Sequence, residues 1–268
     1  MIVDFNGKDI YVEVHGNGAP VVLLNGIMMS IASWKPFIEP LSRDNKLILI
    51  DFLDQGQSHK MTEKYPVALQ ADVVKCVLDA LKIKKSHISG VSYGAAVAMN
   101  FALKYPEYVD RLALFNCIAY SSKWMGYIGD AWKMARITPQ IYYSTTTPII
   151  YSMGFYNKKS DWLESRKDYL INNLFNKKAF LDAMERLIDS MTEHDVRDKL
   201  SSITAETLVV GSSDDNLTPI AEQKYIRDKI PGASLVIMDN CGHASMYENP
   251  TVFILLLTGF INHGTVTL

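Results

Sequence analysis

The stretch His87-Ile88-Ser89-Gly90-Val91-Ser92-Tyr93-Gly94-Ala95-Ala96 decides the fold of this chain. An apolar run typical of a β-strand reaches Gly90, Ser92 follows between two glycines, and small apolar residues continue beyond Gly94. Glycine on either side of the serine removes the Cβ atoms that would collide where a strand and a helix approach closely. The stretch therefore predicts a strand, a sharp turn with Ser92 at its apex, and a helix that lies near the sheet.

The predicted turn gives the hydroxyl of Ser92 a reactive setting. The positive end of the following helix and the backbone amide of Tyr93 would face any anion that forms beside this hydroxyl. Such a composition is typical of a nucleophile elbow, in which a strained turn exposes a serine side chain. Ser92 is therefore the candidate nucleophile.

Strand and helix patterns alternate on both sides of this stretch. The sequence predicts an antiparallel hairpin from residues 2–5 and 10–15, and buried strands at 21–24, 46–53, 109–115, 207–211 and 234–238. Helical patterns follow Pro66 and begin near Pro219 and Pro250. This alternation predicts an α/β fold with a mostly parallel, twisted sheet and helices on both faces.

The alternation stops near Tyr120 and resumes near Lys199. Between them lie only helical patterns, which are interrupted at Pro139 and Pro148, with seven of the 14 tyrosines and three of the four tryptophans. We expect residues 120–199 to form an inserted helical cap on a core made of 1–119 and 200–268. Most of these aromatic side chains should pack the cap onto the core, and some should line an apolar pocket.

Composition and charge exclude several classes of protein. The 27 basic and 29 acidic residues nearly balance, so the sequence favours neither nucleic-acid binding nor an anionic membrane surface. Three widely spaced cysteines suggest neither a disulfide framework nor a zinc site. The first residues lack a signal-peptide pattern, and no apolar run is long enough to span a bilayer. We expect a cytoplasmic protein that acts on a small molecule without a metal or organic cofactor; the sequence leaves its oligomeric state open.

A serine hydroxyl needs a base, and His243 is the best placed of the six histidines. It follows the last predicted strand in a glycine-containing turn, at the sheet edge where catalytic loops gather in doubly wound folds. The other five histidines are expected on the surface or in packing positions: His15, His59, His87, His194 and His263.

The carboxylate that would orient the base should follow the preceding strand, and residues 211–219 offer both Asp214 and Asp215. Only one of these two side chains can face His243. The other would be a solvated carboxylate or would help to cap the next helix. Asn116, after an earlier strand, cannot carry the charge.

The order Ser92, Asp215, His243, together with the elbow and the helical insertion, resembles the α/β-hydrolase superfamily over the whole chain. Residues 90–94 match its nucleophile motif, and Gly242-His243 matches its histidine turn. Residues 215–219 match its Asp-x-x-x-Pro acid loop, and this spacing favours Asp215 over Asp214.

The resemblance also implies an oxyanion hole formed by the backbone amides of Ile27 and Tyr93. Two positions depart from the family pattern, because Asn25-Gly26 replaces the usual His-Gly and Asp54 replaces a glycine. In these loops the chain looks similar to the hydroxyacyl transferases of bacterial rhamnolipid and polyester-precursor synthesis.

These residues predict a serine hydrolase that cleaves a carboxylic ester or thioester with an apolar acyl or aromatic group through an acyl-enzyme. An acyltransferase with the same three residues is the first alternative, since the triad does not choose the acceptor. A non-catalytic small-molecule receptor on the same fold is the second. Serine at the elbow argues against the haloalkane dehalogenases and epoxide hydrolases of this fold, which carry aspartate there.

Overall fold

A mostly parallel sheet forms the centre of the computed structural model, which describes residues 1–264. Its eight strands lie in the order β1-β2-β4-β3-β5-β6-β7-β8. The first two pairs, β1 with β2 and β2 with β4, are antiparallel, and every later pair is parallel. The strands are β1 (Ile2–Asp4), β2 (Asp9–His15), β3 (Ala19–Leu24), β4 (Asn45–Ile50), β5 (Ser86–Val91), β6 (Val109–Phe115), β7 (Glu206–Ser212) and β8 (Ser234–Met238).

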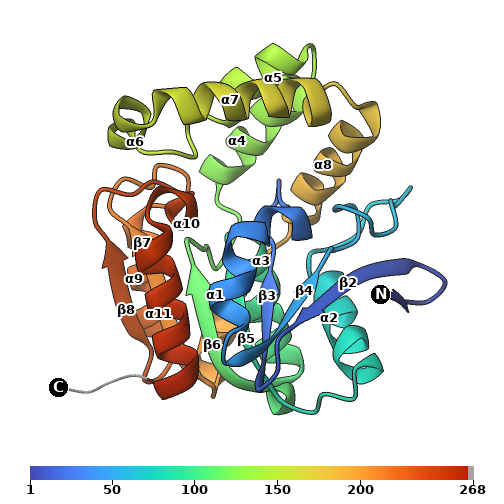
Figure 1. Cartoon of the computed structure of the whole chain (residues 1–268), viewed down its shortest axis with the longest axis vertical. Helices are drawn as coiled ribbons and strands as arrows, with labels where there is room; N and C mark the ends of the chain where they lie inside the picture. The colour runs from blue at the N-terminus through green and yellow to red at the C-terminus, as the bar shows by residue number, and fades with distance from the viewer. Residues whose placement is uncertain (265–268) are drawn as a thin grey trace.

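Helices cover both faces of this sheet, which confirms the predicted α/β class (Figure 1). The helices of the core are α1 (Ile38–Ser42), α2 (Ala68–Ala80), α3 (Tyr93–Lys104), α9 (Ile220–Lys229), α10 (Ser245–Glu248) and α11 (Pro250–His263), with 3₁₀ turns at Ile31–Phe37, Pro106–Tyr108 and Arg197–Ser202. Apolar side chains of α2, α3 and α9 pack on one face of the sheet, and those of α1, α10 and α11 pack on the other.

Strand β3 shows why both faces need a cover. Val22 and Leu24 belong to the core under α2 and α3, whereas Val21 and Leu23 belong to the core under α1 and α11. Successive side chains of a strand point to opposite faces, so a continuous apolar run has to be buried on both sides.

One predicted strand is shorter than expected, because β4 ends at Ile50 and not at residue 53. The Asp51 carboxylate accepts hydrogen bonds from the amides of Ile31 (2.7 Å) and Gln57 (2.8 Å). The Asp51 amide still donates to the Tyr11 carbonyl of β2 (3.0 Å), and beyond it the chain leaves the sheet although Phe52 and Leu53 are apolar.

Five α-helices lie between β6 and β7, within the interval 120–199 in which the sequence predicts only helices. They are α4 (Lys123–Met134), α5 (Pro139–Thr146), α6 (Met153–Lys158), α7 (Ser160–Leu170) and α8 (Lys178–Ser190), with a π-helical turn at Ile171–Phe175. Figure 1 shows them together at the top of the view, above the sheet. We call this set the inserted helices. Within residues 1–264, no helix is both long and apolar enough to span a membrane.

Candidate active site

Ser92 stands at a strained turn between β5 and α3. Its backbone has φ 54° and ψ −114°, and its amide donates a hydrogen bond to the Phe115 carbonyl (2.8 Å). A Cβ atom at Gly90 would lie 2.2 Å from the Gly94 carbonyl oxygen, and one at Gly94 would lie 2.3 Å from that of Leu24. Both glycines are therefore required by the close approach of strand and helix, as the motif predicts.

His243 reaches Ser92 from the turn that follows β8. Its Nε2 lies 2.8 Å from Ser92 Oγ, and its Nδ1 lies 2.9 Å from Asp215 Oδ2. A carboxylate only accepts hydrogen bonds, so Nδ1 carries the proton in the neutral ring and Nε2 accepts from the serine hydroxyl. The structure thus brings together three side chains that are far apart in the sequence.

Asp215 is buried and surrounded by donors. Its carboxylate accepts hydrogen bonds from the amides of Leu217 and Thr218, both at 2.8 Å, and from the Thr218 hydroxyl at 2.7 Å. Burial alone would raise the pKa of this carboxyl, but the charge and hydrogen bond of His243 and the donors of Thr218 lower it below its usual value. Asp215 is therefore held ionised next to the imidazole.

Asp214, the other acid that the sequence offers, makes no hydrogen bond or ion pair with His243 among the described residues. Its side chain is exposed and accepts a hydrogen bond from Ser213 Oγ (2.9 Å). It does not cap helix α9 either, since no side-chain cap bond is present at the N-cap residue Pro219. Of the two acids, only Asp215 contacts the histidine.

Asn116 has a part in this site that the sequence does not reveal. Its Nδ2 donates to Asp215 Oδ2 (2.8 Å) and to Ser212 Oγ (2.9 Å), and its Oδ1 accepts from Ser245 Oγ (2.9 Å). The buried amide therefore ties the ends of β6 and β7 to α10 and fixes the acid. The available signal was its polar side chain at the end of a buried strand.

Ile27 and Tyr93, whose amides would form the oxyanion hole, both line the cavity beside Ser92. Tyr93 is the first residue of α3, so its amide has no acceptor within the helix. In the part of the chain that the structure describes, neither amide donates to a protein acceptor. The Gln55 side chain fixes the loop by donating from Nε2 to the carbonyls of Gly26 (2.9 Å) and Ile27 (3.2 Å).

Asn25 supports this loop at the position where the family resemblance predicts a histidine. Its Nδ2 donates to the Ile50 carbonyl (2.9 Å) and to Gln55 Oε1 (3.0 Å), and its Oδ1 accepts from Trp34 Nε1 (2.6 Å). All three partners are buried. Asn25 is therefore part of the support of the loop and does not face the cavity as a reactive group.

Asp54, the second departure, links the core to the inserted helices. It has a φ of 71°, in the region that favours glycine, and its carboxylate binds Arg186 of α8 through Nε (3.1 Å) and Nη2 (2.6 Å). Tyr65 OH donates to it as well (2.9 Å). The Asp54 side chain is 0% exposed and that of Arg186 18%, so this ion pair is largely buried.

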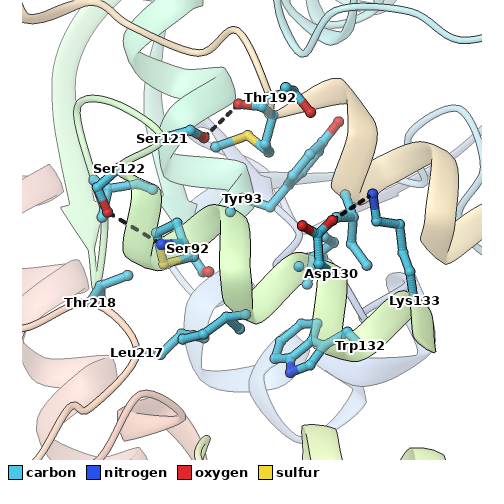
Figure 2. A pocket seen from close by; sticks show the side chains of 18 of the residues that line it. Ser92, Tyr93, Ser121, Ser122, Asp130, Trp132, Lys133, Thr192, Leu217 and Thr218 are labelled. Atoms are coloured by element: carbon cyan, nitrogen blue, oxygen red, sulfur yellow. Dashed lines mark hydrogen bonds and ion pairs between the residues drawn. The ribbon is translucent and has the colours of Figure 1, made fainter. Parts of the chain in front are cut away.

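Two cavities meet at Ser92, between the core and the inserted helices. The first has a volume of about 270 Å³ and is shown in Figure 2, with Trp132 and Leu217 on its wall. The second, of about 100 Å³, is lined by Ser92, His243 and side chains that include Tyr151 and Phe175. Both lie beside the serine hydroxyl, so one molecule bound at Ser92 could extend into both.

Some aromatic residues of the inserted helices are exceptions to the expected packing. Trp132 lines both cavities, but Trp124, Tyr127 and Tyr169 are 55%, 73% and 57% exposed. These three side chains pack neither on the core nor in the pocket. Aromatic content alone does not give the direction in which a helix face points.

Comparisons with known proteins agree with this architecture. Residues 19–145 match the model of the alpha/beta hydrolase fold family, and residues 186–266 match that of a TAP-like protein family. The crystal structure of MGS-M2, an alpha/beta hydrolase enzyme from a Medee basin deep-sea metagenome library, is 41% identical, with a TM-score of 0.97 over 100% of this chain and 99% of the other.

Two curated relatives that the chain matches over more than nine-tenths of their length are hydrolases. The 2-hydroxy-6-oxononadienedioate/2-hydroxy-6-oxononatrienedioate hydrolase of Escherichia coli is 27% identical, over 97% of this chain and 93% of that protein. The 3-oxoadipate enol-lactonase 1 of Acinetobacter baylyi is 24% identical, over 97% and 96% respectively. These relatives support a hydrolase activity. The sheet, the serine turn and the full-length match to MGS-M2 together lead to one conclusion: the chain belongs to the α/β-hydrolase superfamily.

Proposed function

We propose that this protein is a serine hydrolase that cleaves a carboxylic ester or thioester through an acyl-enzyme on Ser92. One observation carries the proposal: a continuous line of hydrogen bonds runs from Ser92 Oγ to His243 (2.8 Å) and from His243 to Asp215 (2.9 Å). A serine hydroxyl becomes a strong nucleophile when a base is positioned to take its proton and a carboxylate holds that base in the right tautomer.

In the first step, Ser92 Oγ attacks the carbonyl carbon while its proton passes to His243 Nε2. The carbonyl oxygen becomes an oxyanion, and the amides of Ile27 and Tyr93 would each donate a hydrogen bond to it, worth about 3 kcal/mol per donor. The ionised Asp215 stabilises the imidazolium. The proton on Nε2 then passes to the leaving alcohol or thiol, and the acyl-enzyme remains.

In the second step, His243 Nε2 takes a proton from a water molecule, whose oxygen attacks the acyl carbon. The same amides hold the second oxyanion. When this intermediate collapses, the proton returns from Nε2 to Ser92 Oγ and the carboxylic acid leaves. All steps use side chains and amides of this chain, and water is the second substrate of the hydrolysis.

The cavities favour a compact substrate. Their volumes of about 270 and 100 Å³ lie at or below the lower end of the range for small-molecule pockets, roughly 300–1,000 Å³. Apolar and aromatic side chains form most of their walls, among them Met28, Trp132 and Phe175. We therefore propose small esters whose acyl or alcohol part is apolar or aromatic, and not long fatty acyl chains.

The experiment that tests this proposal is Ser92→Ala, assayed with 4-nitrophenyl acetate and butanoate. We expect kcat/KM to fall at least about 10⁴-fold, because the covalent step is lost, while the melting temperature stays close to that of the unchanged protein. A fluorophosphonate should label the unchanged protein once, at Ser92, by peptide mass spectrometry. Wild-type turnover by Ser92→Ala would exclude Ser92 as the nucleophile.

Product analysis distinguishes hydrolysis from acyl transfer. With a butanoate ester as donor, a hydrolase releases butanoic acid whether or not an alcohol is added. An acyltransferase would instead form the new ester in preference to the acid at millimolar alcohol. A protein that neither turns over esters nor reacts with the fluorophosphonate would be a receptor on this fold.

A further inference from the structure

Arg166 of α7 lines the second cavity, the one that also contains Ser92 and His243. Its guanidinium carbon lies 4.8 Å from the ring centroid of Tyr247 and 5.4 Å from that of Trp162. Stacking on two rings holds the planar group in place without neutralising its charge. The inserted helices thus place a fixed cation in the same cavity as the candidate nucleophile.

Arg166 differs from its neighbours because it has no acidic partner. Arg136, just after α4, pairs with Asp182, and Arg186 of α8 pairs with Asp54. No ion pair among residues 1–264 includes Arg166. Its Nε is buried and makes no hydrogen bond. A buried donor of this kind is costly unless something accepts from it.

The rest of the cavity wall supplies no negative charge. Burial raises the pKa of the neighbouring Tyr151 phenol to about 12, so this group is neutral at pH 7. Apart from Arg166 and His243, the described wall residues are apolar or uncharged, without an aspartate, glutamate or lysine. The positive charge of Arg166 is therefore available to a ligand.

The first cavity differs from the second in this respect. Asp130 and Lys133 both line it, and they pair with each other at 3.1 Å (Figure 2). Lys133 also pairs with Asp189 at 3.0 Å. Charges on this side are compensated within the protein, so the first cavity suits an uncharged part of a substrate.

We propose that Arg166 is a carboxylate-binding residue, and that the natural substrates are esters whose part in the second cavity carries a carboxylate. A guanidinium presents parallel N–H donors that match the two oxygens of a carboxylate, and the unpartnered Nε would be one of them. The carboxylate would lie in the cavity that reaches Ser92, and so would orient the ester carbonyl toward the serine. This inference rests on the proposed function and specifies its substrate class.

The first test compares monomethyl glutarate with dimethyl glutarate by titrating released acid. The two esters differ mainly in one charge, so the ratio of their kcat/KM values measures recognition of the carboxylate. We expect Arg166→Met to lower this ratio about 10- to 100-fold, the value of a hydrogen-bonded charge, and Arg166→Lys to restore part of it. The half-esters of succinic and adipic acid then show which chain length spans the cavity.

Lys167→Met is the matched control. Lys167 is the next residue in α7, carries the same charge, pairs with Glu164 (2.9 Å) and lines neither cavity. Lys167→Met should leave the ratio of the two kcat/KM values unchanged. An equal ratio in Arg166→Met and in the unchanged protein would overturn the carboxylate subsite, even if dimethyl glutarate is hydrolysed well.

A binding measurement separates this inference from the proposed function. Calorimetry with the Ser92→Ala protein should detect monomethyl glutarate, and adding Arg166→Met should weaken this binding at least tenfold. Arg166-dependent binding in a protein that hydrolyses no ester would retain the subsite and reject the hydrolase. Equal affinity for monomethyl and dimethyl glutarate, unchanged by Arg166→Met, would reject the subsite.

Discussion

The core and the inserted helices position their functional groups in different ways. In the core, Ser92, Asp215 and His243 each follow a strand, namely β5, β7 and β8, so hydrogen bonding between parallel strands places them side by side. In the inserted helices, Trp132 of α4 and Arg166 of α7 reach the cavity from helices that lie outside the sheet.

Packing shows the same contrast. Two large clusters of buried apolar side chains lie on the two faces of the sheet, whereas those within the inserted helices are small. Exposed large apolar side chains also gather there, such as Trp124, Met134 and Met153. The sheet therefore fixes the positions of the three candidate catalytic side chains, and the inserted helices supply side chains that line the cavities beside them.

The largest effect is expected from a change to the candidate catalytic residues of the core. Asp215→Asn keeps the shape of the acid but presents an amide to His243 and removes the charge that stabilises the imidazolium. We expect kcat for a 4-nitrophenyl ester to fall about 10³- to 10⁴-fold. Asp214→Asn, at the exposed neighbour, should change it less than twofold. Equal losses in the two variants would show that the triad assignment is wrong.

The next effect concerns the contact between the two regions. Arg186→Met leaves the Asp54 carboxylate buried, with Tyr65 OH and the Met61 amide as its remaining donors among the described residues. Removing one partner of a buried ion pair typically costs about 3–5 kcal/mol, and we expect a loss of unfolding free energy of this order in urea denaturation. The double variant Asp54→Asn/Arg186→Met should recover much of it. A single-variant loss under about 1 kcal/mol would mean that the pair is not an effective link.

The smallest effect compares one glycine from each region. Gly94→Ala puts a Cβ 2.3 Å from a backbone oxygen of β3, so the strand and helix have to separate, at about 2–3 kcal/mol. Gly126→Ala in α4 meets no atom within 4 Å and should stabilise the helix by about 0.5–1 kcal/mol. Thermal or urea unfolding of both variants measures the difference. Similar changes in both would contradict the difference in packing.

The sequence predicted the core more completely than the inserted helices. The strand patterns at 109–115 and 234–238 coincide with β6 and β8, because apolar runs bounded by turn residues have few alternatives. The spacing of residues 215–219 singled out the acid that contacts His243. From the sequence, Asn116 is only a residue that cannot carry the charge of the acid. Its role as a donor depends on the ends of β6 and β7 lying together.

Side chains of the inserted helices could not be assigned in this way. Arg166 stands in a polar stretch next to Lys167, and nothing in the local pattern distinguishes the cation that lines the cavity from the one on the surface. Asp54 and Arg186 lie 132 residues apart, so their pairing depends on how α8 docks on the core.

By itself, the sequence determined the strand-turn-helix unit around Ser92, the α/β class and the histidine and acid loops, because these follow from local spacing and backbone sterics. Only the tertiary structure decided which side chains line the two cavities and which arginine of the described residues has no acidic partner. These properties depend on distances between segments remote in the chain, and such distances are fixed by packing and not by neighbouring residues.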